Sequence, residues 1–217
     1  MSRFGVAKAL VLLARQGAPL AVAAALEVGV FQLSGVVVMA GGINELAAHQ
    51  TLLTIAGFAA AIPIAVAAAT SIQVAEVAAG GGAARAAHRN AALMTIVLAL
   101  FLGGATLAGG EGVMASFLVA GSASWSHAVR LIPLLAALLM ADTILGGITG
   151  CLRGLGDTGF IGKAALLCFG LGAALLGVLF IRRGSLDTVW GALVGAMLPL
   201  VLAGGGRLAW WTRRSAT

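Results

Sequence analysis

Six long apolar runs dominate the sequence, and charged residues or clusters of Gly and Ser separate them. A helix needs about 20 residues to cross roughly 30 Å of hydrocarbon, and most of the runs approach or exceed that length. The predicted spans are residues 17–40, 46–74, 91–107, 129–150, 164–181 and 189–205. The pattern therefore predicts an all-α integral membrane protein, a bundle of six transmembrane helices.

Two local features modify this pattern. The run 112–121 has about ten residues and is too short to cross, so it predicts an interfacial helix or a loop. Pro63 lies inside the second run, where its missing N–H predicts a kinked helix. The expected organisation is a cytoplasmic N-terminal segment (1–16), a six-span lobe (17–206) and a cytoplasmic C-terminal tail (207–217).

The composition supports membrane helices. The chain has 61% apolar and 9% charged residues and a mean hydropathy of +1.09, whereas soluble domains average about 25% charged residues. A cytosolic enzyme, a disulfide-built secreted domain and a disordered tail are therefore excluded. Glycine is abundant, which favours closely packed helices over a β-barrel. The glycines at four-residue intervals predict packing faces: Gly146, Gly150 and Gly154, and Gly191 with Gly195.

The distribution of Lys and Arg predicts the orientation. Ten of the 13 lie on the side of the termini, and the other three are Arg130, Arg182 and Arg183. This bias predicts a multi-pass protein of the cytoplasmic (inner) membrane with both termini in the cytoplasm. The net charge of +6 is therefore a topology signal, and the expected partner is membrane lipid, with no nucleic acid. Four Trp fit an aromatic belt: Trp125 and Trp190 outside, Trp210 and Trp211 inside.

Two carboxylates fall inside predicted spans. Glu27 and Asp142 both lie roughly 12 to 15 Å from the cytoplasmic end of their helices. A charge at a helix centre costs about 2.5 to 3.5 kcal/mol on insertion scales, so such acids usually mark an ion or substrate pathway. The pair could carry a proton, or exchange it for Na⁺ or an organic cation. The alternative is that each acid is protonated and hydrogen-bonded between helices.

Helical spacing groups other polar residues with the two acids. The expected cavity-lining residues are Phe31 and Ser34 beside Glu27, Thr149 beside Asp142, and Gln50 and Thr54 on the second span. His49 is interpreted as a structural hydrogen-bonding residue. The sequence shows no metal-ligand, nucleophile–base or phosphate-loop arrangement, so we expect no enzyme, no catalytic residue, no metal and no cofactor.

Several motifs, spread over most of the chain, resemble the multidrug and toxic compound extrusion (MATE) transporters, specifically their second six-span half. The motifs are Gly17-Ala18-Pro19 with Leu26-Glu27-Val28-Gly29-Val30-Phe31, Leu46-Ala47-Ala48-His49-Gln50 with Ile62-Pro63, and Asp142 followed by Leu152-Arg153-Gly154-Leu155-Gly156-Asp157-Thr158. The resemblance implies an antiporter for multidrug (xenobiotic) efflux, which exchanges Na⁺ or H⁺ for small cationic or amphipathic compounds. It also implies that Glu27 and Asp142 help to form the cation site.

The sequence departs from the family pattern at one position near this site. Several relatives have a Tyr one turn before the acid of the tenth span, where this chain has Leu138. The choice of coupling ion, Na⁺ or H⁺, therefore stays open. We interpret Asp157 as a turn or helix-cap residue.

The family packs two six-span lobes around a central cavity, and this sequence supplies one. It begins with Met1 and a basic segment, as a complete chain would. Three explanations stay open: a fragment, a half that pairs with a separately encoded lobe, or a half that forms a homodimer. Two other functions also stay open, a flippase of the same superfamily for a lipid-linked substrate, and a non-transporting fragment or assembly partner whose acids are buried structural groups.

Overall fold

The structure is a computed structural model that describes residues 3–80 and 84–214. In these ranges the chain forms eight helices. Helices α2 and α3 together form one candidate span, α5 is too short to cross, and each of the other five is a candidate span by itself, so six spans are long and apolar enough to cross a membrane. The helices are α1 (Arg3–Met39), α2 (Ile43–Ala59), α3 (Ala61–Ala79), α4 (Ala84–Met114), α5 (Ala123–Arg130), α6 (Ile132–Gly154), α7 (Thr158–Ile181) and α8 (Leu186–Arg214).

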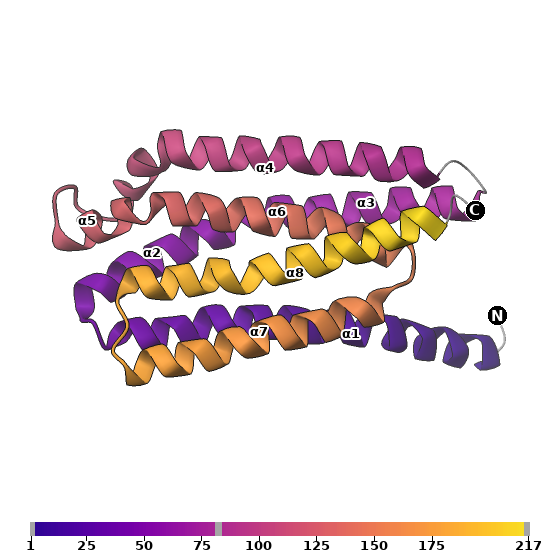
Figure 1. Cartoon of the computed structure of the whole chain (residues 1–217), viewed down its shortest axis with the longest axis horizontal. Helices are drawn as coiled ribbons and strands as arrows, with labels where there is room; N and C mark the ends of the chain where they lie inside the picture. Colours follow the sequence, from indigo (N-terminus) through magenta and orange to yellow (C-terminus); the bar gives the residue numbers. More distant parts are fainter. Residues whose placement is uncertain (1–2, 81–83, 215–217) are drawn as a thin grey trace.

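The long helices run side by side, with both termini at one end of the bundle and α5 at the other (Figure 1). We call these the terminal end and the α5 end. Helix α6 packs against α3, α4 and α8, while α1 packs against α7, and α7 against α8. Half of the apolar window of α6 is buried, more than in any other described span. The bundle is thus organised around α6, the helix that carries Asp142.

The second span is broken at Ala60, where α2 ends and α3 begins. Pro63 occupies the first turn of α3, where a helix does not need the N–H that proline lacks. The break lies just before the proline, so the predicted interruption of this helix is confirmed.

The connection between α4 and α6 differs in detail from the prediction. Helix α4 continues to Met114, so the run 112–121 is the end of that helix and a turn. The short helix is α5, capped by Ser122, whose Oγ accepts the Trp125 backbone N–H at 3.1 Å. The fourth span therefore begins at Ile132 rather than at 129. Hydropathy misses α5 because this short helix is too polar to stand out as an apolar run.

Helical structure also extends through both predicted segment boundaries. Helix α1 is already formed at Arg3, and α8 continues to Arg214, well beyond the apolar runs themselves. Residues 1–2 and 215–217 of the two predicted cytoplasmic segments lie outside the described residues.

A stripe of glycines brings α6 against α3. A Cβ on Gly146 would lie 2.6 Å from the Pro63 carbonyl oxygen, and one on Gly150 would lie 2.6 Å from that of Ala67. Gly154 similarly faces the backbone of α3. The predicted packing role of Gly146, Gly150 and Gly154 is therefore confirmed. Within this lobe it is wrong for Gly191 and Gly195, because among the described residues no other helix or packed side chain comes within 4 Å of where their Cβ would stand.

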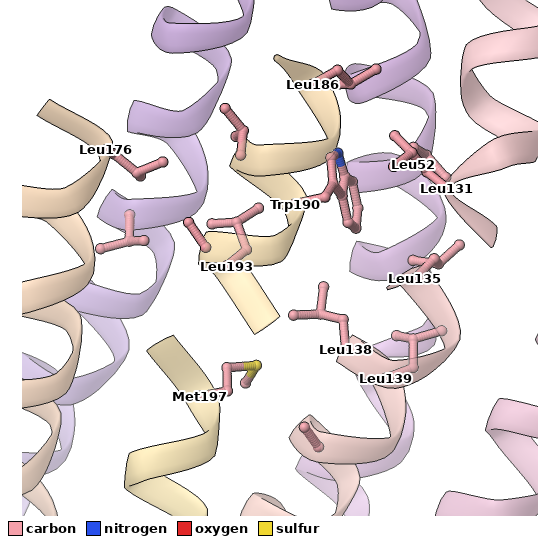
Figure 2. Packing of buried hydrophobic residues seen from close by; sticks show 14 of the residues in the cluster. Leu52, Leu131, Leu135, Leu138, Leu139, Leu176, Leu186, Trp190, Leu193 and Met197 are labelled. Atoms are coloured by element: carbon pink, nitrogen blue, oxygen red, sulfur yellow. The ribbon is translucent and has the colours of Figure 1, made fainter. Parts of the chain in front are cut away.

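The buried core near the α5 end consists largely of leucines around one tryptophan. Figure 2 shows Trp190 reaching from α8 toward Leu52 of α2 and the leucines of α6. Trp190 is fully buried, so its predicted place in an aromatic belt is wrong. The position of Trp190 along α8 fits the membrane–water interface. Because α8 is apolar on almost every face, however, the sequence does not show that the Trp190 side chain points into the bundle.

Candidate functional site

The structure brings Glu27 of α1 and Asp142 of α6 to the same place. Both side chains are half-buried, and both line the same two cavities. Among the described residues, no side chain or backbone group forms a hydrogen bond or ion pair with either carboxyl. We call these two residues the acid pair. Its bonding capacity is directed to the cavities.

The first cavity, which we call the α2 cavity, has a volume of about 240 Å³ and lies between α1, α2 and α6. Gln32 is polar, and the remaining wall is apolar apart from the acid pair. The lining residues are Glu27, Val28, Phe31, Gln32, Leu53, Ala56, Gly57, Ala60, Leu138, Leu139 and Asp142. Leu138, the departure from the family pattern, therefore adds an apolar surface one turn from Asp142.

The second cavity, the α3 cavity, has a volume of about 330 Å³ and lies toward the terminal end. Helices α1 and α3 form its sides, and α6, α7 and Leu200 of α8 complete it. Small side chains such as Ala24, Ala67 and Gly146 leave the space open. Thr149 and Arg153 add polar groups at the end away from the acid pair.

The two cavities meet at the acid pair. Glu27, Val28, Ala60 and Asp142 belong to both linings. Pockets for small molecules typically have volumes of about 300 to 1,000 Å³ and are mostly apolar with a few polar groups. The arrangement has this character, with two carboxyl groups where one apolar chamber passes into the next.

Two of the five predicted lining residues lie in these linings. Phe31 contributes to the α2 cavity and Thr149 to the α3 cavity. Ser34 is buried elsewhere, while Gln50 and Thr54 are exposed on α2, where the Thr54 hydroxyl donates to the Gln50 carbonyl at 2.8 Å. These three are in neither lining, because spacing along one helix defines a shared face but not what that face meets.

Sequence reasoning missed Gln32 and Arg153 as lining residues. Gln32 had no distinguishing signal, since it follows Phe31 on a different face of α1. Arg153 did have one, because Asp142, Gly146, Thr149 and Arg153 recur at the three- and four-residue intervals of a single helix face.

A second buried polar cluster lies toward the α5 end. Trp190 donates its indole N–H to His49 Nδ1 at 3.1 Å. In a neutral ring this leaves the proton on Nε2, which donates to Ser34 Oγ at 3.1 Å, and Ser34 donates to the Phe31 carbonyl at 2.6 Å. This His49 network joins α8, α2 and α1, with both ring nitrogens of His49 paired, so the structural role predicted for His49 is confirmed.

At the terminal end, Asp157 joins the α6–α7 turn to α8. Its Oδ2 accepts Arg207 Nε at 2.6 Å and Trp211 Nε1 at 2.8 Å. Burial alone would raise the pKa of this carboxyl, but the hydrogen bonds from Arg207 and Trp211 and the charge of Arg207 hold the pKa of Asp157 below its usual value. Asp157 occupies the predicted turn and the N-cap position of α7, but its side chain is engaged by α8.

The described residues contain no group of three or more His, Cys, Asp or Glu side chains that could hold a metal ion. The acid pair supplies two carboxyl groups. A bound monovalent cation would therefore complete its coordination with backbone carbonyls or water, which are ordinary ligands of hard cations.

A family model described as MatE matches residues 19–178, which includes the acid pair, the His49 network residues of α1 and α2, and Asp157. Among curated proteins, none matches this sequence. The described fold is similar to the crystal structure of the eukaryotic MATE transporter AtDTX14, with a TM-score of 0.78, 22% identity and 94% of this chain covered. It is also similar to a MOP superfamily transporter from Pyrococcus furiosus, with a TM-score of 0.73, 20% identity and 92% covered.

The chain spans about half the length of these two transporters, 47% of the first and 44% of the second. At these identities the similarity establishes a shared fold. The Pyrococcus furiosus transporter is described as having a binding pocket of reversed polarity, which suggests a different function for that protein.

Proposed function

Since the chain belongs to the MatE family, whose members are membrane transporters, we propose that it forms one lobe of an antiporter coupled to Na⁺ or H⁺. The exported compounds are cationic or amphipathic, and the acid pair is the coupling site. The observation that carries this proposal is the position of two carboxyl groups, without protein partners among the described residues, where two apolar cavities meet.

The proposed mechanism is competition for the acid pair. A bound Na⁺ or proton neutralises a carboxyl group and lowers its attraction for a substrate cation, while release of the ion restores that attraction. Each ligand favours the conformation in which it binds more tightly, so alternating occupancy shifts the population between two states. The apolar walls of both cavities fit the hydrophobic part of a substrate.

We further propose that the terminal end faces the cytoplasm of the cell and that a second six-span lobe completes the transporter. Ten of the 13 Lys and Arg fall at this end, in line with the bias of cytoplasmic loops. The second lobe is either a separate chain or a second copy, since lobes related by an axis along the membrane normal can pair in parallel. A reporter fused after Thr217 tests the orientation.

The test of function is efflux of a fluorescent organic cation from liposomes that contain the purified chain, driven by a Na⁺ or a proton gradient. Glu27→Gln and Asp142→Asn should each reduce gradient-driven efflux to the level of empty liposomes. The amide that replaces the carboxyl group carries no negative charge and cannot exchange a proton, and the coupling site needs both carboxyl groups. The oligomeric state is measured in the same preparation, since the proposed lobe requires a partner.

The matched control is Glu111→Gln, an exposed acid on α4 outside both cavities. It removes one carboxylate from the same bundle and should leave efflux unchanged. Normal efflux by both acid-pair variants would refute the coupling role. If the chain is monomeric and inactive alone, the same variants are tested by Na⁺- or pH-dependent binding of the dye.

A further inference from the structure

Arg153 lies at the end of the α3 cavity that is farther from the acid pair. Helix α6 carries Asp142, Gly146, Thr149 and Arg153 on one face, and all four line this cavity. The interval of 11 residues from Asp142 to Arg153 corresponds to roughly 16 Å along the helix axis. Arg153 is exposed at this end, and because side chains on a helix lean toward its N-terminus, we expect its guanidinium group to extend over the opening of the cavity. One cavity therefore has carboxyl groups at one end and a guanidinium group at the other.

Among the residues that the structure describes, Arg153 takes no part in an ion pair. In the part of the chain that the structure describes, the ion pairs are Arg130 with Asp187 and Arg207 with Asp157. A guanidinium group presents several N–H donors in a planar fork that matches a carboxylate or a phosphate. Its donors are thus available to an anionic group that enters the cavity.

The wall between the two charged ends is apolar. Helix α1 contributes Leu20 and Ala23, α3 contributes Ile64, and α7 contributes Ile161 and Phe169. Such a wall binds a hydrophobic segment and provides no partner for a charge at intermediate depth. A ligand that matches the whole cavity has a charged group at each end of an apolar body.

We propose that Arg153 forms an anion subsite, so that the α3 cavity binds amphipaths with a cationic group at the acid pair and a carboxylate or phosphate at Arg153. The cationic half of this inference rests on the proposed function; the anion subsite rests on Arg153 and the apolar wall. The anionic group has two sources with the same chemistry, a substrate in solution or the headgroup of an anionic lipid.

The experiment compares two probes that differ in one charge, trimethylammonio-undecanoate and its methyl ester. Binding is measured to the full chain in nanodiscs of phosphatidylcholine. The chain should bind the zwitterion about tenfold more tightly than the ester, the value expected for one charge-assisted hydrogen bond. Arg153→Gln should remove this preference and leave affinity for the ester unchanged, and Arg153→Lys should retain part of it.

Lys163→Gln is the matched control, because this exposed cation lies on α7 outside the cavity lining. It should preserve the preference for the zwitterion. The proposal is overturned if Arg153→Gln keeps the full preference for the zwitterion over the ester. It is also overturned if the chain without substitutions shows no such preference in phosphatidylcholine nanodiscs.

A second set of nanodiscs, containing phosphatidylglycerol, distinguishes the two sources of the anion. If the chain without substitutions no longer prefers the zwitterion over the ester in these nanodiscs, a lipid headgroup is the occupant of the anion subsite. An unchanged preference identifies the solute.

Glu27→Gln separates this inference from the proposed function. It should weaken both probes equally, because both carry the cationic group. If it weakens neither probe while Arg153→Gln still removes the preference, the cation site is wrong and the anion subsite stands.

Discussion

The bundle contains two sets of polar groups, the buried His49 network and the half-buried acid pair, which differ in their bonding partners. In the His49 network both ring nitrogens of His49, the Trp190 N–H and the Ser34 hydroxyl are paired with other protein atoms. In the acid pair, among the residues described, neither carboxyl has a hydrogen-bond partner in the protein, and both face cavities. The two sets lie within a few turns of each other on α1. Burial of a polar group therefore does not by itself mark a candidate site, and the acid pair is the candidate because its carboxyl groups line open space without partners among the described residues.

The largest expected effect comes from replacing both members of the acid pair by leucine. Glu27→Leu with Asp142→Leu should abolish cation-dependent transport and binding. The fold should not weaken, because these carboxyls form no hydrogen bond among the described residues and leucine favours insertion. Efflux assays measure the expected loss of transport, and thermal unfolding in detergent measures the expected stability. A large fall in melting temperature would show that the acid pair stabilises the fold, as the His49 network is expected to do, and the two sets would then not differ in role.

The next largest expected effect is a loss of stability on substituting the glycine stripe, where α6 packs against α3. Gly150→Val should destabilise the bundle by about 3 kcal/mol, since the new side chain meets the Ala67 backbone, which cannot move aside. Gly191→Val is the control, because the position of its Cβ is open. Equal unfolding midpoints for the two variants would contradict this packing.

Replacing the centre of the His49 network should weaken the fold by a smaller amount. His49→Leu leaves the Trp190 N–H without its acceptor and the Ser34 hydroxyl without its donor, at a cost of about 1 to 3 kcal/mol. The exposed neighbour Gln50→Leu should have no such effect. Chemical unfolding in detergent measures both. Unchanged stability in His49→Leu would mean that the network is not what joins α8, α2 and α1.

The smallest effect concerns Asp157 at the terminal end. Its pKa is lower in the folded chain than the usual value of about 3.9, so its ionised form contributes stability above that pH. This contribution is lost as the pH falls through the folded pKa. Asp157→Asn should lower the free energy of unfolding by less than about 1 kcal/mol at neutral pH, because the ion pair is partly exposed. It should also reduce the loss of stability that the unsubstituted chain shows as the pH falls through the acidic range. Superimposable stability–pH curves for the two proteins would argue against the pair.

Much of the fold follows from hydropathy, because a membrane span is long and apolar whatever it packs against. The six spans, the break near Pro63 and the close approach at Gly150 are all visible in the sequence. What could not be predicted is which way each helix faces. Almost every face is apolar in these spans, so the inward position of Trp190 and the outward position of Gln50 leave no periodic signal.

The site was predictable to a different degree. Glu27 and Asp142 stand out because a carboxyl group in a span is costly, and their depths can be counted from the span ends. The partners of Ser34 could not be inferred, since its hydroxyl meets His49 across an interface between helices. Arg153 lies at the edge of a span, where basic residues are common, and this position concealed its place in the α3 cavity.

The break at Ala60 has a mechanical consequence. Helix α2 borders one cavity through Leu53 and Gly57, and α3 borders the other through Pro63 and Ala67. Helix α2 is tied to α8 through the His49 network, whereas α3 is held against α6 by the glycine stripe. Ala60 itself lines both cavities, so a change in the angle between α2 and α3 would change the widths of the two cavities together. The break in the second span thus lies beside the acid pair, where the two cavities meet.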